Sequence, residues 1–103
     1  MPDRNWVPMI SFTVRLKFRS DDRARVAEIL TALAQASRRE PGCVSYIPHT
    51  VDGDADTVVI YEQYKDQQAV DAHRATPHFR DYAVGGLYQL MLDRQVENLT
   101  SIA

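Results

Sequence analysis

The sequence has little that would cross-link the chain or anchor it in a membrane. It contains one cysteine, Cys43, so an internal disulfide is excluded, which suits a reducing compartment. No stretch approaches the roughly 20 consecutive apolar residues that span a bilayer. The N-terminal segment MPDRNWVPM has charges and prolines where a signal peptide has an apolar run. We therefore expect a cytoplasmic protein that has no membrane partner.

The sequence also lacks a strong excess of charge of either sign. Its 12 basic and 14 acidic side chains give a net charge of -2, which provides no basic field for nucleic acid. It has no glycine-rich phosphate loop and none of the usual zinc-binding spacings, so we predict no nucleotide or metal cofactor. A chain of 103 residues forms one domain with a small core. Cover from a partner subunit would enlarge that core.

The first half of the chain changes from strand periodicity to helix periodicity. Residues 9–18 alternate between apolar and polar side chains, which predicts a strand with one buried face. A stripe of apolar residues at helical spacing follows, and it predicts a helix that begins at Ser20 or Asp21 as the N-cap. Pro41 and Gly42 close this segment.

The second half adds the elements that complete a single sheet. The predicted elements are a strand at 43–50, a polar turn at 51–56, a strand at 57–64, a helix at 67–74 capped by Asp66, a helix from Thr76 and Pro77 that loosens at Gly85 and Gly86, and a strand at 92–99. Pro48 places its strand at a sheet edge or at a bulge. The order predicts an α+β, ferredoxin-like sandwich over residues 9–99, with helices on one face of an antiparallel sheet. Residues 1–8 are an N-terminal extension and residues 100–103 a C-terminal tail.

Glu62 is the first residue that does not fit a purely structural role. It shares a strand face with Val58 and Ile60, which point toward the core. A carboxylate among apolar side chains is costly unless it is paired, hydrogen-bonded or protonated, so its pKa should be raised. Such a group can act as an acid or a base near neutral pH. The alternative is that the strand face opens to water at this point.

His73 and His78 lie on either side of the predicted helix break at Thr76. The break can fold both imidazoles over one spot, although a gap of five residues does not place them on one helical face. A metal needs further ligands, for which His49 and Glu62 are the candidates, and we predict no metal. The structural alternative is that His78 bonds nearby backbone and His73 is a solvated helix end.

Two segments, EPGCVSY and VVIYEQYKDQQAVDAHRATPHF, resemble the antibiotic biosynthesis monooxygenase family. The resemblance covers nearly the whole domain, from about Met9 to Val96. The positions that carry it are Glu40, Pro41, Gly42, Cys43, Tyr46, Glu62, Tyr64, Ala69, His73, Thr76, His78 and Phe79.

The family resemblance implies a homodimer, described as a dimeric α+β barrel, with a pocket in each subunit between sheet and helices. It also implies a monooxygenase that oxidises a quinol, phenol or anthrone-like aromatic with O2 and without a bound cofactor. The implied catalytic residues are Glu62, His73 and His78. The residues expected to contact the substrate are Tyr46, His49, Phe79 and Tyr82.

Two other functions remain open from the sequence. The same acid–base groups suit an isomerase or tautomerase of a small oxygenated metabolite, and the fold equally suits a non-catalytic dimer that binds a small molecule. Oxygen consumption, proton exchange without oxygen, and binding without turnover distinguish the three functions.

Overall fold

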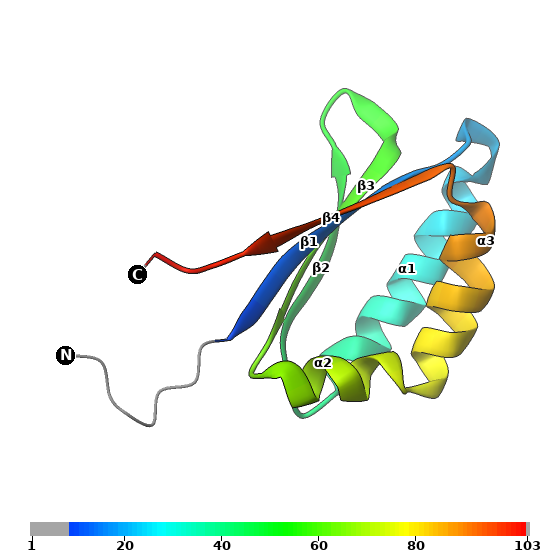
Figure 1. Ribbon diagram of the computed structural model, residues 1–103. Helices are drawn as coiled ribbons and strands as arrows, with labels where there is room; N and C mark the ends of the chain where they lie inside the picture. Colours follow the sequence, from blue (N-terminus) through cyan, green and yellow to red (C-terminus); the bar gives the residue numbers. More distant parts are fainter. Residues whose placement is uncertain (1–8, 103) are drawn as a thin grey trace, which may run out of the picture.

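The structure is a computed structural model that describes residues 9–102. Four antiparallel strands form one sheet in the order β2-β3-β1-β4, and the helices all lie on one side of it (Figure 1). The predicted N-terminal extension, residues 1–8, and the last residue of the predicted tail, Ala103, lie outside the described residues. In the part of the chain that is described, no helix is both long and apolar enough to cross a membrane.

The elements occur in the predicted order, and the ferredoxin-like α+β fold is confirmed. They are β1 (Ile10–Lys17), a 3₁₀ turn η1 (Ser20–Asp22), α1 (Arg23–Arg38), β2 (Cys43–Val51), β3 (Asp54–Tyr64), α2 (Gln67–Arg74), a π-helix η2 (Phe79–Leu87), α3 (Tyr88–Leu90) and β4 (Asp93–Leu99). A short turn joins the neighbouring strands β2 and β3, whereas helices carry the chain from β1 to β2 and from β3 to β4 over one face of the sheet.

The core lies between the helix-facing side of the sheet and α1. In β1, the alternating residues Phe12, Val14 and Leu16 are buried against the helices, as the period of two predicts. The register pairs with β3 are Phe12–Glu62, Val14–Ile60 and Leu16–Val58. This register places Glu62 at the same level of the sheet as the buried ring of Phe12.

The predicted cap of the first helix is wrong. The N-cap of α1 is Asp22, rather than Ser20 or Asp21, and its side chain makes no capping hydrogen bond. Arg19, the N-cap of η1, makes none either. The Ser20 hydroxyl instead donates to Asp56 Oδ2 at 2.8 Å, and Arg23 Nε donates to Asp56 Oδ1 at 2.6 Å. The carboxylate of Asp56 therefore ties the start of the helix to β3, which a local capping rule does not predict.

The polar turn between the second and third strands is shorter than the predicted range 51–56. Only Asp52 and Gly53 separate β2 from β3, and Gly53 has a φ of 80°, a conformation that suits glycine. Asp54 is the first residue of β3, and its carboxylate accepts a hydrogen bond of 2.6 Å from the Thr57 hydroxyl. The acidic residues here thus support the hairpin rather than forming an open loop.

The helix that begins after Thr76 is mostly a π-helix, a conformation that the sequence patterns do not predict. The segment η2 contains Gly85 and Gly86, where the sequence predicts a loosening. A Cβ on Gly86 would lie 3.3 Å from two carbon atoms of Ile29, so glycine allows η2 to approach α1 closely. π-Helical segments are uncommon and often occur next to functional sites.

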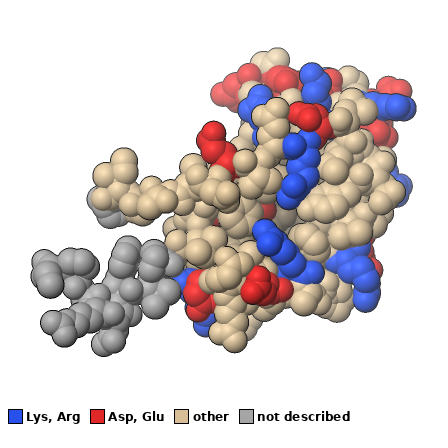
Figure 2. Space-filling view, in the orientation of Figure 1, with Lys and Arg blue, Asp and Glu red and all other residues tan. Residues whose placement is uncertain are grey.

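Strands β2 and β4 form the two edges of the sheet. Strand β2 is an edge strand, as Pro48 predicts. At the opposite edge, every residue of β4 is exposed, including Val96 and Leu99. Acidic and basic side chains are interspersed over the face seen in Figure 2, without a continuous basic patch.

Candidate active site

Glu62 lies on the helix-facing side of β3 and is buried, with 5% of its surface exposed. It is flanked by Phe12 of β1 on one side and by Tyr46 of β2 on the other. The alternative in which this strand face opens to water is therefore wrong, and the carboxyl needs partners inside the protein.

Tyr64 provides one such partner two residues along the same face. Its hydroxyl donates a hydrogen bond of 2.6 Å to Glu62 Oε1. Burial raises the pKa of Glu62 to about 7, against the opposing effects of this hydrogen bond and of the positive charge of Arg74. The carboxyl thus changes charge close to neutral pH, which is a property of acid–base groups in enzymes.

His73 lies near the end of α2 with 3% of its surface exposed, and it stands between two carboxyl groups. Its Nδ1 is 2.8 Å from Glu40 Oε2, and its Nε2 is 3.8 Å from Glu62 Oε1. Burial lowers the pKa of His73, although Glu40 opposes that effect. In the neutral ring, we assign the proton to Nδ1, from which it is donated to the Glu40 carboxylate. The unprotonated Nε2 then faces Glu62.

Glu40 also joins His73 to His78. The Nε2 of His78 is 2.5 Å from the same Oε2 atom of Glu40, and the two imidazole centroids are 6.2 Å apart. The helix break therefore brings the two histidines together, which is one of the arrangements that the sequence leaves open, and a glutamate bridges them. The ligand atoms of these three residues lie within 4.8 Å of one another, an arrangement that can hold a metal ion.

Glu40 reaches this position because the chain turns tightly after α1. The Glu40 N–H donates to the Ser37 carbonyl, and the Cys43 N–H donates to the Glu40 carbonyl, both at 3.1 Å. A Cβ on Gly42 would collide with the side chain of Ala69, so glycine is required where this turn packs on α2. The turn and α2 are thereby held in contact, with Glu40 directed at His73.

The buried groups border a small cavity between the sheet, α1 and η2. Its volume is about 40 Å³. It is lined by Phe12, Val14, Leu16, Leu33, Tyr46, Ile60, Glu62, His73, Arg74, Phe79, Ala83, Leu87, Tyr88 and Arg94. This volume has room for one or two water molecules, so a larger ligand requires side chains at the cavity to move.

The structure brings some of the predicted substrate-contacting residues to this cavity and not others. The rings of Tyr46 and Phe79 lie 5.9 and 5.2 Å from that of His73 and line the cavity. Tyr82 is 38% exposed on η2 and lies outside it. His49 also lies outside it, on the edge strand β2.

Several residues of the site are not among the predicted catalytic or substrate-contacting residues. They are Glu40, Tyr64, Arg74, Tyr88 and Arg94. Tyr64 could have been found, because it shares a strand face with Glu62. Arg94 faces the helices through its pairing with Leu16, and its guanidinium lies 5.5 Å from the centroid of Tyr88. No spacing in the sequence indicates that contact.

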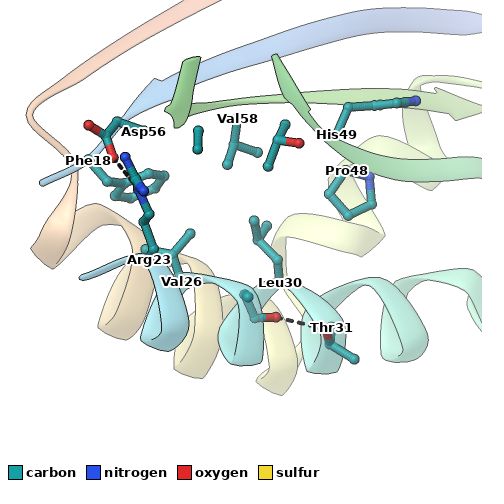
Figure 3. A pocket seen from close by; sticks show the side chains of 12 residues that line it. Phe18, Arg23, Val26, Leu30, Thr31, Pro48, His49, Asp56 and Val58 are labelled. Carbon is teal, nitrogen blue, oxygen red and sulfur yellow. Dashed lines mark hydrogen bonds and ion pairs between the residues drawn. The ribbon is translucent and has the colours of Figure 1, made fainter. Parts of the chain in front are cut away.

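A larger cavity of about 390 Å³ lies at the other end of the sheet (Figure 3). It separates α1 from β2 and β3, with Val26 and Leu30 on the helix side and Val58 on the sheet side. Arg23 and Asp56 form an ion pair at one end, and His49 and Pro48 lie at the other. Apolar side chains form most of its walls, whereas the buried carboxyl of Glu62 and the buried imidazole of His73 border the smaller cavity. We therefore place the candidate active site at the smaller cavity.

The fold and this site define an α+β protein with acid–base groups gathered between sheet and helices. The sequence pattern of the antibiotic biosynthesis monooxygenase family matches residues 9–84, so the chain belongs to that family. Family membership supports a monooxygenase-like function.

Individual relatives agree with this assignment. "Putative monooxygenase Rv0793" of Mycobacterium tuberculosis is 32% identical over 73 residues, which are 71% of each chain. "Putative monooxygenase YcnE" of Bacillus subtilis is 30% identical over 78 residues, covering 76% of this chain and 82% of YcnE. The solved structure of Rv0793 superposes with a TM-score of 0.83 and 26% identity, covering 92% of this chain and 96% of its own. That of PA3566 from Pseudomonas aeruginosa, with a TM-score of 0.86, 24% identity and coverage of 94% and 97%, supports the fold alone.

Proposed function

We propose that the protein is a cofactor-independent monooxygenase that oxidises a quinol, phenol or anthrone-like aromatic with O2. The observation that carries this proposal is the pairing of a buried carboxyl, Glu62, with a buried imidazole, His73, at the edge of an apolar cavity. A buried base of this kind can remove a phenolic proton in a site from which most water is excluded.

The proposed reaction begins with transfer of the substrate's acidic proton to Glu62. The anion that remains is electron-rich and lies near the positive charges of Arg74 and Arg94, which border the same cavity. That anion reduces O2 directly. For an anthrone, the CH2 group becomes C=O with one oxygen atom, and the other oxygen leaves as water with the two hydrogens, so no external reductant is needed. The proton taken by Glu62 passes through His73 to the departing oxygen, so that both groups return to their starting protonation states after each turnover.

Substrate entry requires the cavity to widen, since an aromatic ring does not fit into about 40 Å³. The side chains best placed to move are Phe79 and Tyr88, which are partly buried and pack edge to face with centroids 6.3 Å apart. Both belong to the helical segment that follows the break after α2. A movement of that segment would open the cavity without disturbing the sheet.

We propose that the working assembly is a homodimer. Strand β4 is exposed along its whole length, including the apolar side chains of Val96 and Leu99. Ile47 on the other edge strand, β2, is 42% exposed. In a chain this small, these apolar side chains are best accounted for by cover from a second copy. Light scattering in solution should give twice the mass of the chain, and a monomer mass at micromolar concentration would contradict the proposal.

The function is tested by oxygen uptake with a panel of quinols and anthrones, compared with the autoxidation rate without protein. Uptake that saturates with substrate, together with a product that has gained one oxygen atom, supports the proposal. Proton exchange with solvent deuterium and no oxygen uptake would instead indicate an isomerase. Saturable binding with neither activity would indicate a small-molecule-binding dimer.

A further inference from the structure

Glu40, His73 and His78 form a three-residue cluster on the side of His73 that faces away from Glu62. Two imidazole nitrogens, Nδ1 of His73 and Nε2 of His78, approach one carboxylate oxygen of Glu40 at 2.8 and 2.5 Å. The three residues come from the turn after α1, from α2 and from the residue preceding η2. The fold therefore gathers two nitrogen donors and one oxygen donor from separate parts of the chain.

The cluster needs only a small adjustment to surround a metal ion. A tetrahedral zinc ion lies about 2.0–2.1 Å from each ligand atom, so its ligand atoms are roughly 3.3 Å apart. The two short distances to Glu40 would have to increase by less than about 1 Å to meet that requirement. The two nitrogens, which lie no more than 4.8 Å apart, would have to approach each other by up to about 1.5 Å. The side chains of His78 and Glu40 are 20% and 13% exposed, so they can turn outward, while that of His73 at 4% stays fixed.

Surrounding residues already hold the backbone that carries His73 and His78, and they orient the ring of His73. The Thr76 hydroxyl donates to the His73 carbonyl at 2.7 Å and accepts from the Phe79 N–H at 3.2 Å, which fixes the backbone between the two histidines. On its other side, His73 Nε2 faces Glu62 Oε1 at 3.8 Å. Histidine ligands of metals commonly direct their second nitrogen at such a carboxylate, which orients the ring.

We propose that the protein binds one divalent transition-metal ion of the Zn²⁺ class through Glu40, His73 and His78. Imidazole donors favour Zn²⁺, Co²⁺ and similar ions, whereas Ca²⁺ and Mg²⁺ prefer oxygen ligands alone. Three protein ligands leave a fourth position, which solvent can occupy on the exposed side of His78. This proposal is independent of the proposed oxidation, since binding is measured without substrate.

The test begins with protein that carries no affinity tag and has been stripped with a chelator and dialysed. Isothermal titration with ZnCl2 should show one ion bound per chain at micromolar concentration. Co²⁺ should give the visible absorption of a site with low coordination number. The near-ultraviolet band that a cysteine ligand would add should be missing, because Cys43 is not in the cluster.

Two variants and one matched control locate the ion. Glu40→Gln and His78→Asn should each weaken Zn²⁺ binding at least about tenfold. His49→Asn changes the remaining histidine, which lies outside the cluster, and should leave the affinity unchanged. His78 is partly exposed, so its variant should fold even if Glu40→Gln does not, and circular dichroism checks both. Stoichiometry well below one, wild-type affinity in His78→Asn, or a thiolate band with Co²⁺ would each overturn the proposal.

Discussion

Tyr64 donates a 2.6 Å hydrogen bond to Glu62, and both residues are buried on the same face of β3. This bond fixes one carboxylate oxygen of Glu62 on its own strand, at 3.8 Å from His73 Nε2. Because both residues belong to β3, the hydrogen bond that orients the carboxyl involves no atom of the helices. If the helical segment moves to admit a substrate, the proposed proton acceptor keeps its position.

Replacing Glu62 by Gln should keep the fold and lower the rate of oxygen uptake. The amide has nearly the same shape but cannot accept the substrate proton, and losing a general base typically costs about 10²- to 10⁴-fold. The measurement is the initial rate of oxygen uptake with the best substrate of the quinol and anthrone panel. Glu28→Gln, which changes an exposed glutamate on α1, is the matched control. An unchanged rate in Glu62→Gln would show that the carboxyl is structural.

Replacing Tyr64 by Phe should shift the pH dependence of activity upward. The hydroxyl stabilises the charged form of Glu62, so its removal raises the pKa of that carboxyl further. The acidic limb of kcat/KM, measured in chelator-treated protein, should move to higher pH by about one unit. Tyr61→Phe, on the opposite face of β3, should leave the limb in place. A shift toward lower pH in Tyr64→Phe would contradict this role of the hydroxyl.

The stability of the protein should fall as the pH rises through neutrality, in part because of Glu62. Its pKa is about 7 in the folded protein and near its ordinary value of 4.5 when the chain is unfolded. The folded state therefore binds the extra proton, and the stabilisation is complete below pH 4.5 and is lost as the pH passes 7.

Glu62→Gln removes that dependence, so the comparison with wild type isolates it. The difference in unfolding free energy between pH 5 and pH 8 should be smaller in the variant by on the order of 3 kcal/mol. Urea unfolding of both metal-free proteins at the two pH values measures the difference. Equal pH dependence in wild type and variant would show that Glu62 is not held in its protonated form.

The periodicities in the sequence predict most of the fold because they reflect burial. The alternation in β1 and the inward register of Glu62 are local patterns that the sheet preserves. The contact of Glu40 with His73 joins residues 33 positions apart, through a turn that packs on α2, and no periodicity encodes it. The close approach of Gly86 to Ile29 on another helix is likewise a contact between distant residues, and no periodicity encodes it.

Replacing Gly42 by Ala should destabilise the protein through the packing of the turn against α2. The new Cβ would collide with Ala69, whose backbone belongs to the helix that carries His73. We expect a loss of about 1–3 kcal/mol in the free energy of unfolding, the usual range for overpacking. Gly85→Ala is the comparison, because a Cβ there meets only a backbone oxygen at 3.3 Å and should cost less. A neutral Gly42→Ala would show that the turn can shift away from α2.

Zn²⁺ should inhibit oxygen uptake, and a chelator should restore it, if the metal site and the proposed oxidation are both present. An ion on His73 Nδ1 leaves the ring with a proton on Nε2, so the ring can no longer accept the proton from Glu62. The measurement is the rate at increasing Zn²⁺, first in wild type and then in His49→Asn, which should be inhibited equally. Zinc that binds to the Glu40 cluster without slowing turnover would show that His73 does not carry the proton. Turnover that falls in parallel with the occupancy of the cluster would place His73 in the reaction.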